Sequence, residues 1–295
     1  MYVNSNEIFM PELPEVETIK NDLTKRILNK KIRDIEIRKK KIVRNKANLF
    51  LKTLINNEFS AIDRIGKLLI FSLRRNNEFL LIHLKMTGQL IYCQQGKFIV
   101  GGHSLPKIGT SLPNKYSHVI FTFADNSKLF FNDLRQFGYL EIVDEEKLKK
   151  IKSQFGIEPL TKEFKLPKLE EIFKKKSTLI KAVLMDQGLI AGIGNIYADE
   201  ILFAAQINPN HQAKNLNKKE VVRIYKASSQ VIRTAIKHRG TTFNDYTDAD
   251  GNVGSFAKFL KVYGRAGEKC YRCGSIVKKI KMAGRGTHFC PTCQR

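Results

Sequence analysis

The sequence has no long hydrophobic run, few cysteines and few acidic residues. Although 42% of its 295 residues are hydrophobic, its apolar stretches fall far short of the roughly 18 residues that a membrane-spanning helix needs. The first nine residues, MYVNSNEIF, have neither the basic start nor the apolar core of a secretory signal. We therefore expect a cytoplasmic protein without a membrane partner, long enough for one large or two medium domains.

The shortage of acidic residues gives the chain a large positive charge. Its 28 Asp and Glu face 52 Lys and Arg, for a net charge of +24 and a pI near 9.8. Such a surplus attracts polyanions, and phosphate backbones supply most of the affinity in these pairings. Nucleic acid is the favoured partner, while a solubilising lysine-rich surface or a ribosomal or membrane-surface role is the alternative. Charge does not distinguish DNA from RNA.

Four of the five cysteines are arranged as C-x2-C-x16-C-x2-C, namely Cys270, Cys273, Cys290 and Cys293. This spacing is typical of structural zinc sites, in which four thiolates close a tetrahedral shell around the metal. A pair of disulfides is the alternative, disfavoured because nothing indicates export to an oxidising compartment. Cys93, in a strand-like stretch, is predicted to be a small buried hydrophobe.

From about residue 30 to 143 the apolar residues come in short, partly alternating runs such as HVIFTF (118–123). Turn sequences at 74–77 and 124–127 separate them. The pattern predicts an antiparallel β-sandwich. Residues 101–115, rich in Gly, Ser and Pro, are predicted to form a surface loop.

A helix is predicted ahead of the strands, over residues 14–30. Pro14 suits its first turn, where a missing N–H costs nothing. Four apolar residues repeat at helical spacing and share one face: Val16, Ile19, Leu23 and Ile27.

After about residue 150 the apolar period becomes helical, as in residues 177–187. The glycine-rich stretch 188–195 opens onto another helix, with Asn195 as its expected N-cap. Its backbone N–H groups could hold one phosphate, or the stretch is simply a tight turn between packed helices. A third helix is expected from the capping box at 217–220 to a stop at Gly240.

The last segment is the most basic. Residues 261–295 contain nine Lys and Arg against one Glu, a net +8, which four thiolates and one Zn²⁺ would reduce to +6. Arg285 lies between the two cysteine pairs, where a guanidinium on a metal-held hairpin suits a groove or a phosphate.

Seven motifs occur in order along the chain: PELPEVET (11–18), RIGKLL (64–69), HLKMTG (83–88), DLRQFG (133–138), GIGNIYADE (192–200), VYGRAGEKC (262–270) and RGTHFCPTCQ (285–294). With the cysteine spacing, they resemble the formamidopyrimidine-DNA glycosylase family in its bacterial MutM form. The resemblance implies an α+β fold with one structural zinc. Its expected parts are an N-terminal helix plus β-sandwich domain (10–145), a helix-two-turn-helix domain (146–258) and a zinc finger (259–295).

In that family the nucleophile is the secondary amine of an N-terminal proline, which Pro11 matches. Inside a chain this nitrogen is a tertiary amide whose lone pair is delocalised. Freed, it is an α-amine with a pKa of roughly 8 that can form an iminium with a sugar carbon. We therefore expect Met10 to be the true start and residues 1–9 an upstream extension, with proteolytic removal as the alternative.

The resemblance implies an enzyme that flips 8-oxoguanine or a formamidopyrimidine out of double-stranded DNA, acting as a monomer. Pro11 would attack C1′ and displace the base, and Glu12 would move protons at the sugar. Lys67 would contact the lesion's phosphate, and β,δ-elimination would cleave the strand. Glu15 either supports Pro11 or is an ordinary acid of the first helical turn.

Flipping leaves a gap that inserted side chains must fill. Met86, Arg135 and Phe137 match the family's inserted trio, although Met86 and Phe137 would by themselves be more typical of a core. Three further residues match phosphate contacts: His83, Asn195 and Arg285. Gln136 stands where many relatives have a second arginine, which puts the strength of opposite-base recognition in doubt. A lesion-capping loop is expected within 241–256.

Two other functions are weighed against this one. An endonuclease VIII-like enzyme for oxidised pyrimidines has a different N-terminal pattern and different wedge residues. A non-enzymatic zinc-ribbon protein would bind nucleic acid with steep salt dependence but would release no base.

Overall fold

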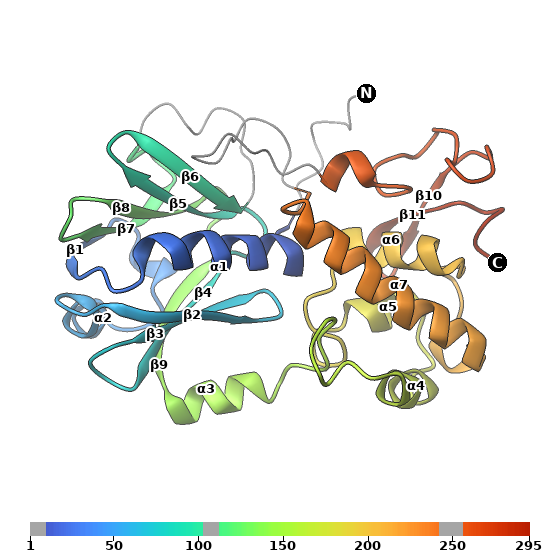
Figure 1. Ribbon diagram of the computed structural model, residues 1–295, viewed down its shortest axis with the longest axis horizontal. Helices are drawn as coiled ribbons and strands as arrows, with labels where there is room; N and C mark the ends of the chain where they lie inside the picture. The colour runs from blue at the N-terminus through green and yellow to red at the C-terminus, as the bar shows by residue number, and fades with distance from the viewer. Residues whose placement is uncertain (1–9, 103–111, 242–255) are drawn as a thin grey trace. The chain divides into compact units, whose positions relative to one another are not determined.

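The computed structural model describes residues 10–102, 112–241 and 256–295 (Figure 1). Contacts divide these residues into two compact units. The sandwich unit comprises 10–102, 112–153 and 239–241, and the helical unit comprises 154–238 and 256–295. Most of the predicted loop at 101–115 and of the lesion-capping loop at 241–256 lies outside the described residues.

The sandwich unit contains two antiparallel sheets, as the apolar pattern predicted. One has the strand order β1-β7-β8-β5-β6 and the other β2-β3-β4-β9. Their bounds are β1 Ile32–Ile37, β2 Phe59–Ile65, β3 Leu68–Leu73, β4 Glu78–His83, β5 Gly88–Gln94, β6 Lys97–Gly102, β7 Ser117–Phe123, β8 Lys128–Asp133 and β9 Tyr139–Asp144.

Helix α1 (Leu13–Ile27) packs against β2, β3 and β6, so it contacts both sheets (Figure 1). All four residues of its predicted apolar face are buried, in one core with phenylalanines of several strands. Burial of each such side chain contributes about 1.5–3 kcal/mol. The predicted loop at 101–115 begins too early, because Gly101 pairs with β5 and a Cβ there would lie 2.3 Å from Ile19 of α1.

Short helices complete the sandwich unit: η1 Lys40–Ile42, α2 Ala47–Leu54 and α3 Glu145–Lys152. Because α3 packs against β4 and β9, the contacts place the change of unit at 153/154 rather than at 145/146. Cys93, predicted to be buried, is half-buried at the edge of a small cluster around Ile91 and Phe130.

The helical unit contains helices followed by a two-stranded hairpin. Helix α6 packs against α5, α7 and the hairpin strand β11. The bounds are α4 Leu166–Lys174, α5 Ile180–Met185, α6 Asn195–Ala205, η3 Ala213–Asn215, α7 Lys218–Lys237, η4 Phe256–Phe259, β10 Lys278–Met282 and β11 Arg285–Phe289.

Local signals fixed both ends of α7. The capping box of Asn217 and Glu220 begins α7 as predicted, and Arg239 and Gly240 follow its end with φ of 61° and 79°. The N-cap predicted for α6 is wrong, because Gly194 occupies that position and Asn195 is the first helical residue. Among the described residues, no helix is long and apolar enough to cross a membrane.

Candidate functional site

The N-terminus of α1 brings together buried polar groups around Pro11 and Glu12. Glu12 is the N-cap and is 1% exposed, and Pro11 is also buried. The Glu12 N–H donates to Oε2 of Glu15 at 2.9 Å. The other carboxylate oxygen, Oε1, accepts the N–H and the hydroxyl of Thr241 at 2.7 and 3.0 Å. Glu15 is therefore a buried link between α1 and residues 239–241, and not an ordinary acid of a solvent-facing first turn.

Lys67 lies in the tight turn between β2 and β3 and is 7% exposed. The preceding strand holds this turn against α1, because Arg64 Nε donates to Glu17 Oε2 at 2.6 Å and Arg64 Nη1 donates to the Gly66 carbonyl at 3.3 Å. Burial raises the pKa of Glu17, but a hydrogen bond from Lys20 and the charge of Arg64 outweigh it, so the pKa is lowered. The turn with Lys67 is thus held to α1 at Glu17, five residues after Glu12.

His83 ends β4 and pairs with Leu68, next to Lys67. Its Nδ1 accepts the Lys85 N–H at 3.0 Å. Burial and the charges of Lys85, Lys67 and Arg44 lower the pKa of His83 to about 3. The imidazole is therefore neutral at physiological pH, with its proton on Nε2, which makes that atom a hydrogen-bond donor.

The predicted inserted trio lies on two connections of the sandwich. Met86 is half-buried in the β4–β5 connection, and Arg135 and Phe137 belong to the β8–β9 connection. Phe137 is 53% exposed, with the Arg135 guanidinium 4.8 Å from its ring centroid. Gln136 between them has a φ of 57°. Phe137 is therefore not a core residue, although its sequence alone would favour that.

Asn195 and Arg285 belong to the helical unit. The Asn195 amide nitrogen donates to the Gly286 carbonyl at 3.1 Å and, at 3.4 Å, to the Tyr263 hydroxyl. Arg285 is exposed, begins β11 and pairs with Met282 at the end of the β10–β11 hairpin, as expected for a residue at its tip. The Asn195 side chain thus contacts the backbone of the hairpin next to Arg285 instead of capping its own helix.

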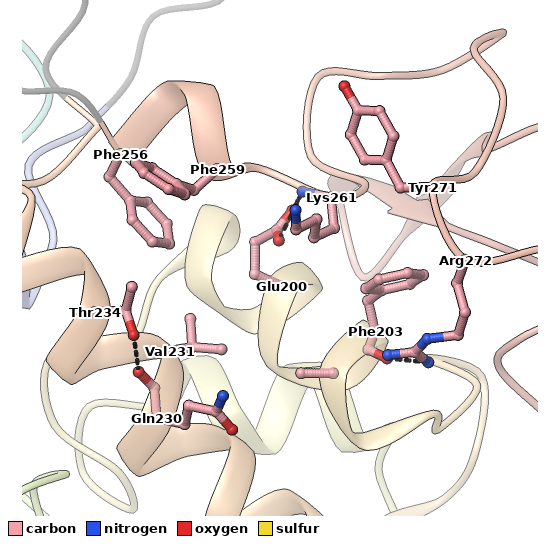
Figure 2. Close-up of a pocket in the computed structure, with 11 residues that line it drawn as sticks. Glu200, Phe203, Gln230, Val231, Thr234, Phe256, Phe259, Lys261, Tyr271 and Arg272 are labelled. Carbon is pink, nitrogen blue, oxygen red and sulfur yellow. Dashed lines mark hydrogen bonds between the residues drawn. The ribbon is translucent and has the colours of Figure 1, made fainter.

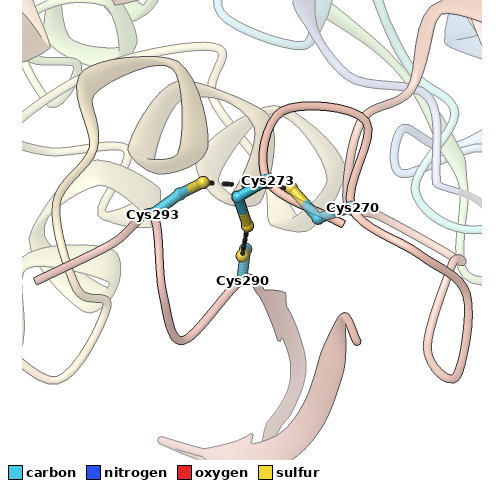
Figure 3. Close-up of side chains that lie close together, drawn as sticks. All are labelled: Cys270, Cys273, Cys290 and Cys293. Atoms are coloured by element: carbon cyan, nitrogen blue, oxygen red, sulfur yellow. Dashed lines mark hydrogen bonds between the residues drawn. The ribbon is translucent and has the colours of Figure 1, made fainter. Parts of the chain in front are cut away.

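The four cysteines converge at the base of this hairpin (Figure 3). Their sulfurs all lie within 4.8 Å of one another, with Cys270 and Cys293 at 3.9 Å and Cys273 and Cys290 at 3.4 Å. Sulfurs in a tetrahedral shell with Zn–S bonds of about 2.3 Å are about 3.8 Å apart. The donor set and its spacing therefore fit one structural zinc ion, as predicted, and leave no position for a reacting water.

The structure adds a buried ionic cluster that sequence reasoning missed. Lys181 Nζ lies 2.7 Å from Asp199 Oδ1 and donates to Thr287 Oγ1 at 2.8 Å, while the His288 N–H donates to Asp199 Oδ2 at 2.8 Å. All four of these residues are at most 3% exposed. Helices α5 and α6 thereby hold the zinc hairpin. The sequence signals were the positions of Asp199 within the motif at 192–200 and of Thr287 and His288 within the motif at 285–294.

The neighbouring Glu200 performs a similar task on the segment before the zinc finger. Its carboxylate accepts the N–H groups of Lys261, Val262 and Tyr263, each at 2.9 Å. Burial raises the pKa of Glu200, although these hydrogen bonds oppose the shift. Beside it, a cavity of about 490 Å³ opens between α6, α7, η4 and the first cysteine loop (Figure 2). None of the predicted site residues lines this cavity.

Comparison with known proteins agrees with these features. Three family models match successive parts of the chain: the formamidopyrimidine-DNA glycosylase N-terminal domain (10–140), the H2TH domain of the same glycosylases (155–247) and the zinc finger found in FPG and IleRS (267–295).

Full-length relatives have the same description. The formamidopyrimidine-DNA glycosylase of Desulfitobacterium hafniense is 41% identical, covering 97% of this chain and all of the relative. That of Pelotomaculum thermopropionicum is 37% identical, covering 97% of this chain and 99% of the relative.

Solved structures show the same fold. The Lactococcus lactis Fpg in complex with DNA containing an abasic site has a TM-score of 0.86 and 34% identity, covering 96% of this chain and 99% of that chain. The same enzyme with Fapy-dG DNA has a TM-score of 0.84. The predicted α+β fold and the predicted zinc finger are both confirmed. By sequence, domain order and structure, the chain belongs to the formamidopyrimidine-DNA glycosylase family of base-excision DNA glycosylases.

Proposed function

We propose that this chain excises oxidised purines, namely 8-oxoguanine and formamidopyrimidines, from double-stranded DNA and then cleaves the strand as an AP lyase. The printed names of its relatives and the abasic and Fapy-dG DNA bound by structural neighbours support this substrate class. The observation that carries the proposal is the arrangement of the sandwich unit, in which Arg64 and Glu17 hold the turn with Lys67 against the helix that begins beside Glu12.

The chemistry begins at Pro11. Freed from Met10, its secondary amine attacks C1′ of the damaged nucleotide, and the bond from C1′ to the base breaks with its electron pair leaving on the base. Opening of the sugar ring gives an iminium between Pro11 and C1′. Loss of the 3′ phosphate and then of the 5′ phosphate by elimination leaves a one-nucleoside gap. Glu12, buried next to Pro11, moves protons between the sugar and these leaving groups.

Binding of the lesion's phosphates falls to both units. In the sandwich unit, Lys67 supplies a charge and neutral His83 supplies an Nε2–H donor. In the helical unit, Asn195 and Arg285 supply further contacts beside the zinc hairpin. The zinc ion, when bound, maintains the geometry of this hairpin and takes no part in bond breaking.

The exposed ring of Phe137 suits insertion into the base stack, where it would unstack a step and kink the duplex. Met86 would fill the space left by the flipped base, and Arg135 would face the orphaned cytosine. Arg135 matches the first arginine of the family's motif, and only the second is replaced, by Gln136. We therefore expect cytosine to remain the preferred opposite base.

Trapping with borohydride tests the proposal, because reduction converts the iminium into a stable amine. Protein beginning at Met10 and protein beginning at Met1 are incubated with an 8-oxoguanine:cytosine duplex and borohydride. We expect a covalent complex only for the Met10 form, since removal of Met10 frees the Pro11 nitrogen. Pro11→Gly should retain a free α-amine but trap more slowly, and Pro14→Ala serves as the matched control because Pro14 lies inside α1.

Absence of trapping by the Met10 form, with zinc and DNA binding intact, would remove the glycosylase proposal and leave a protein that only binds DNA. A panel of lesions tests the substrate class separately. Faster release of thymine glycol than of 8-oxoguanine would favour an endonuclease VIII-like specificity instead.

A further inference from the structure

Two connections of the sandwich unit present the proposed inserted residues. Residues 84–87 join β4 to β5 and include Met86, and residues 134–138 join β8 to β9 and include Arg135 and Phe137. We call these two segments the wedge loops. They are far apart in the sequence but adjacent in space, because Gly88 of β5 pairs with Asp133 of β8.

Asp133, immediately before the second wedge loop, is fully buried and binds both loops through its carboxylate. Its Oδ1 accepts the Thr87 hydroxyl and, at 3.2 Å, the Arg135 N–H. Its Oδ2 accepts the Gly138 N–H at 2.7 Å. Each hydrogen bond to a charged carboxylate is stronger than one between neutral groups.

Thr87, also fully buried, completes this junction from the first wedge loop. Its hydroxyl oxygen accepts the Arg135 N–H at 2.9 Å while its proton goes to Asp133. One hydroxyl therefore joins the residue after Met86 to the backbone of Arg135. Serine is the only other residue type that carries a hydroxyl, both donor and acceptor, on so short a side chain.

The backbone of both wedge loops is tightly constrained around this junction. Lys85 and Gln136 have φ of 53° and 57°, a region that non-glycine residues occupy at a cost. A Cβ on Gly88 would lie 2.4 Å from the Leu84 carbonyl oxygen, and one on Gly138 would lie 2.9 Å from the His83 carbonyl oxygen. Loops of this kind hold their shape only where surrounding contacts determine it.

We infer that Asp133 and Thr87 are positioning residues that hold Met86, Arg135 and Phe137 in one fixed arrangement before DNA arrives. Such preorganisation removes the entropic cost of ordering three side chains on two loops at the moment of insertion. The pair therefore acts on opening of the duplex and on recognition of the opposite base, and not on bond breaking at the sugar. This inference rests on the function proposed above, which it extends to two further residues.

The test separates opening of the duplex from chemistry. Opening is followed by stopped-flow fluorescence of 2-aminopurine next to the lesion, and opposite-base recognition by the ratio of excision rates opposite cytosine and adenine. Chemistry alone is followed by borohydride trapping on a single-stranded oligonucleotide with an abasic site, which needs no wedge. The variants are Thr87→Val, Asp133→Asn and Thr87→Ser, with Thr122→Val as a buried threonine of the same sheet that does not touch the junction.

For Thr87→Val and Asp133→Asn we expect opening to slow by about tenfold to a hundredfold, as misplaced functional groups typically cause, and the cytosine/adenine ratio to approach one. Trapping on the single strand should stay within about twofold of the unmodified chain. Thr87→Ser should restore opening, and Thr122→Val should leave every readout unchanged.

Unchanged opening and an unchanged cytosine/adenine ratio in Thr87→Val and Asp133→Asn would overturn the inference. Equal loss of opening and of single-strand trapping would also overturn it, because the pair would then support the fold in general. If the unmodified chain begun at Met10 fails to trap the single strand, the proposed function itself is wrong, which is a separate result.

Discussion

At the scale of single residues, His83 shows how burial and neighbouring charges together select a chemical role. Burial, with the charges of Lys85, Lys67 and Arg44, lowers the pKa of His83 to about 3, so it stays neutral where an isolated histidine would begin to protonate. A neutral donor binds phosphate without adding a charge that the surrounding cations would repel. The sequence motif predicted a phosphate contact, but the protonation state depends on burial of His83 and on charged groups from three separate connections.

A stability measurement checks this protonation state. Because the folded pKa lies below the ordinary value of 6.5, the unfolded chain binds more protons between pH 6.5 and pH 3. The stabilising effect of neutral His83 is complete above pH 6.5 and decreases as the pH falls towards 3. We expect the melting temperature of the sandwich-unit transition to decrease relative to that of His83→Gln between pH 7 and pH 4. A constant difference over this range would show that His83 titrates alike in both states.

Phe137 gives a second prediction at this scale. Because its ring is half-exposed, Phe137→Ala should change the free energy of unfolding by less than about 0.5 kcal/mol while slowing opening of the duplex. Phe71→Ala is the matched comparison, since Phe71 is fully buried in the sandwich core and should cost about 3–5 kcal/mol. Urea denaturation measures both changes, and a large loss for Phe137→Ala would place its ring in the core instead.

At the scale of elements, buried carboxylates determine how helices and loops are joined. Glu15 joins the start of α1 to Thr241, Asp133 joins the two wedge loops, and Asp199 and Glu200 of α6 hold the zinc hairpin and the segment before it. Each accepts N–H groups that would otherwise be buried without a partner, which is costly. The alternation of apolar residues predicted the strands, and their helical period predicted the helices, because both patterns depend only on residues close together in the sequence.

Glu15 provides a test of this role. Glu15→Ala leaves the Glu12 N–H and the Thr241 N–H without this acceptor, so we expect a loss of about 1–3 kcal/mol in stability. Trapping by the Met10 form should also slow, since Glu12 adjoins Pro11. Glu145→Ala is the control, because Glu145 is exposed in an i,i+4 pair with Lys149, and surface pairs of this kind contribute little to stability. Equal effects of the two substitutions on thermal stability would contradict a linking role for Glu15.

At the scale of the whole molecule, the contacts form two units with separate cores. A structural zinc ion contributes its binding free energy to the fold that holds the ligands, so its effect should be confined to the helical unit. We expect calorimetry to show two transitions, of which a zinc chelator lowers only one. Cys273→Ser should reproduce the effect without chelator. A single transition that shifts as a whole would show that the two units unfold together.

What the sequence alone determined is local or is carried by motif order: the cysteine spacing for zinc, the buried face of α1, the strands and turns of the sandwich, and the family. The tertiary structure decided which distant groups meet. In the folded chain Phe137 is exposed, Gly194 is the N-cap of α6, and the Asn195 side chain donates to the backbone of the zinc hairpin. The hydrogen-bond partners of Glu15, Asp133 and Asp199 likewise depend on the tertiary structure. The physical reason is that periodicity follows from adjacent residues, whereas a buried carboxylate is stable only where the whole fold supplies its donors.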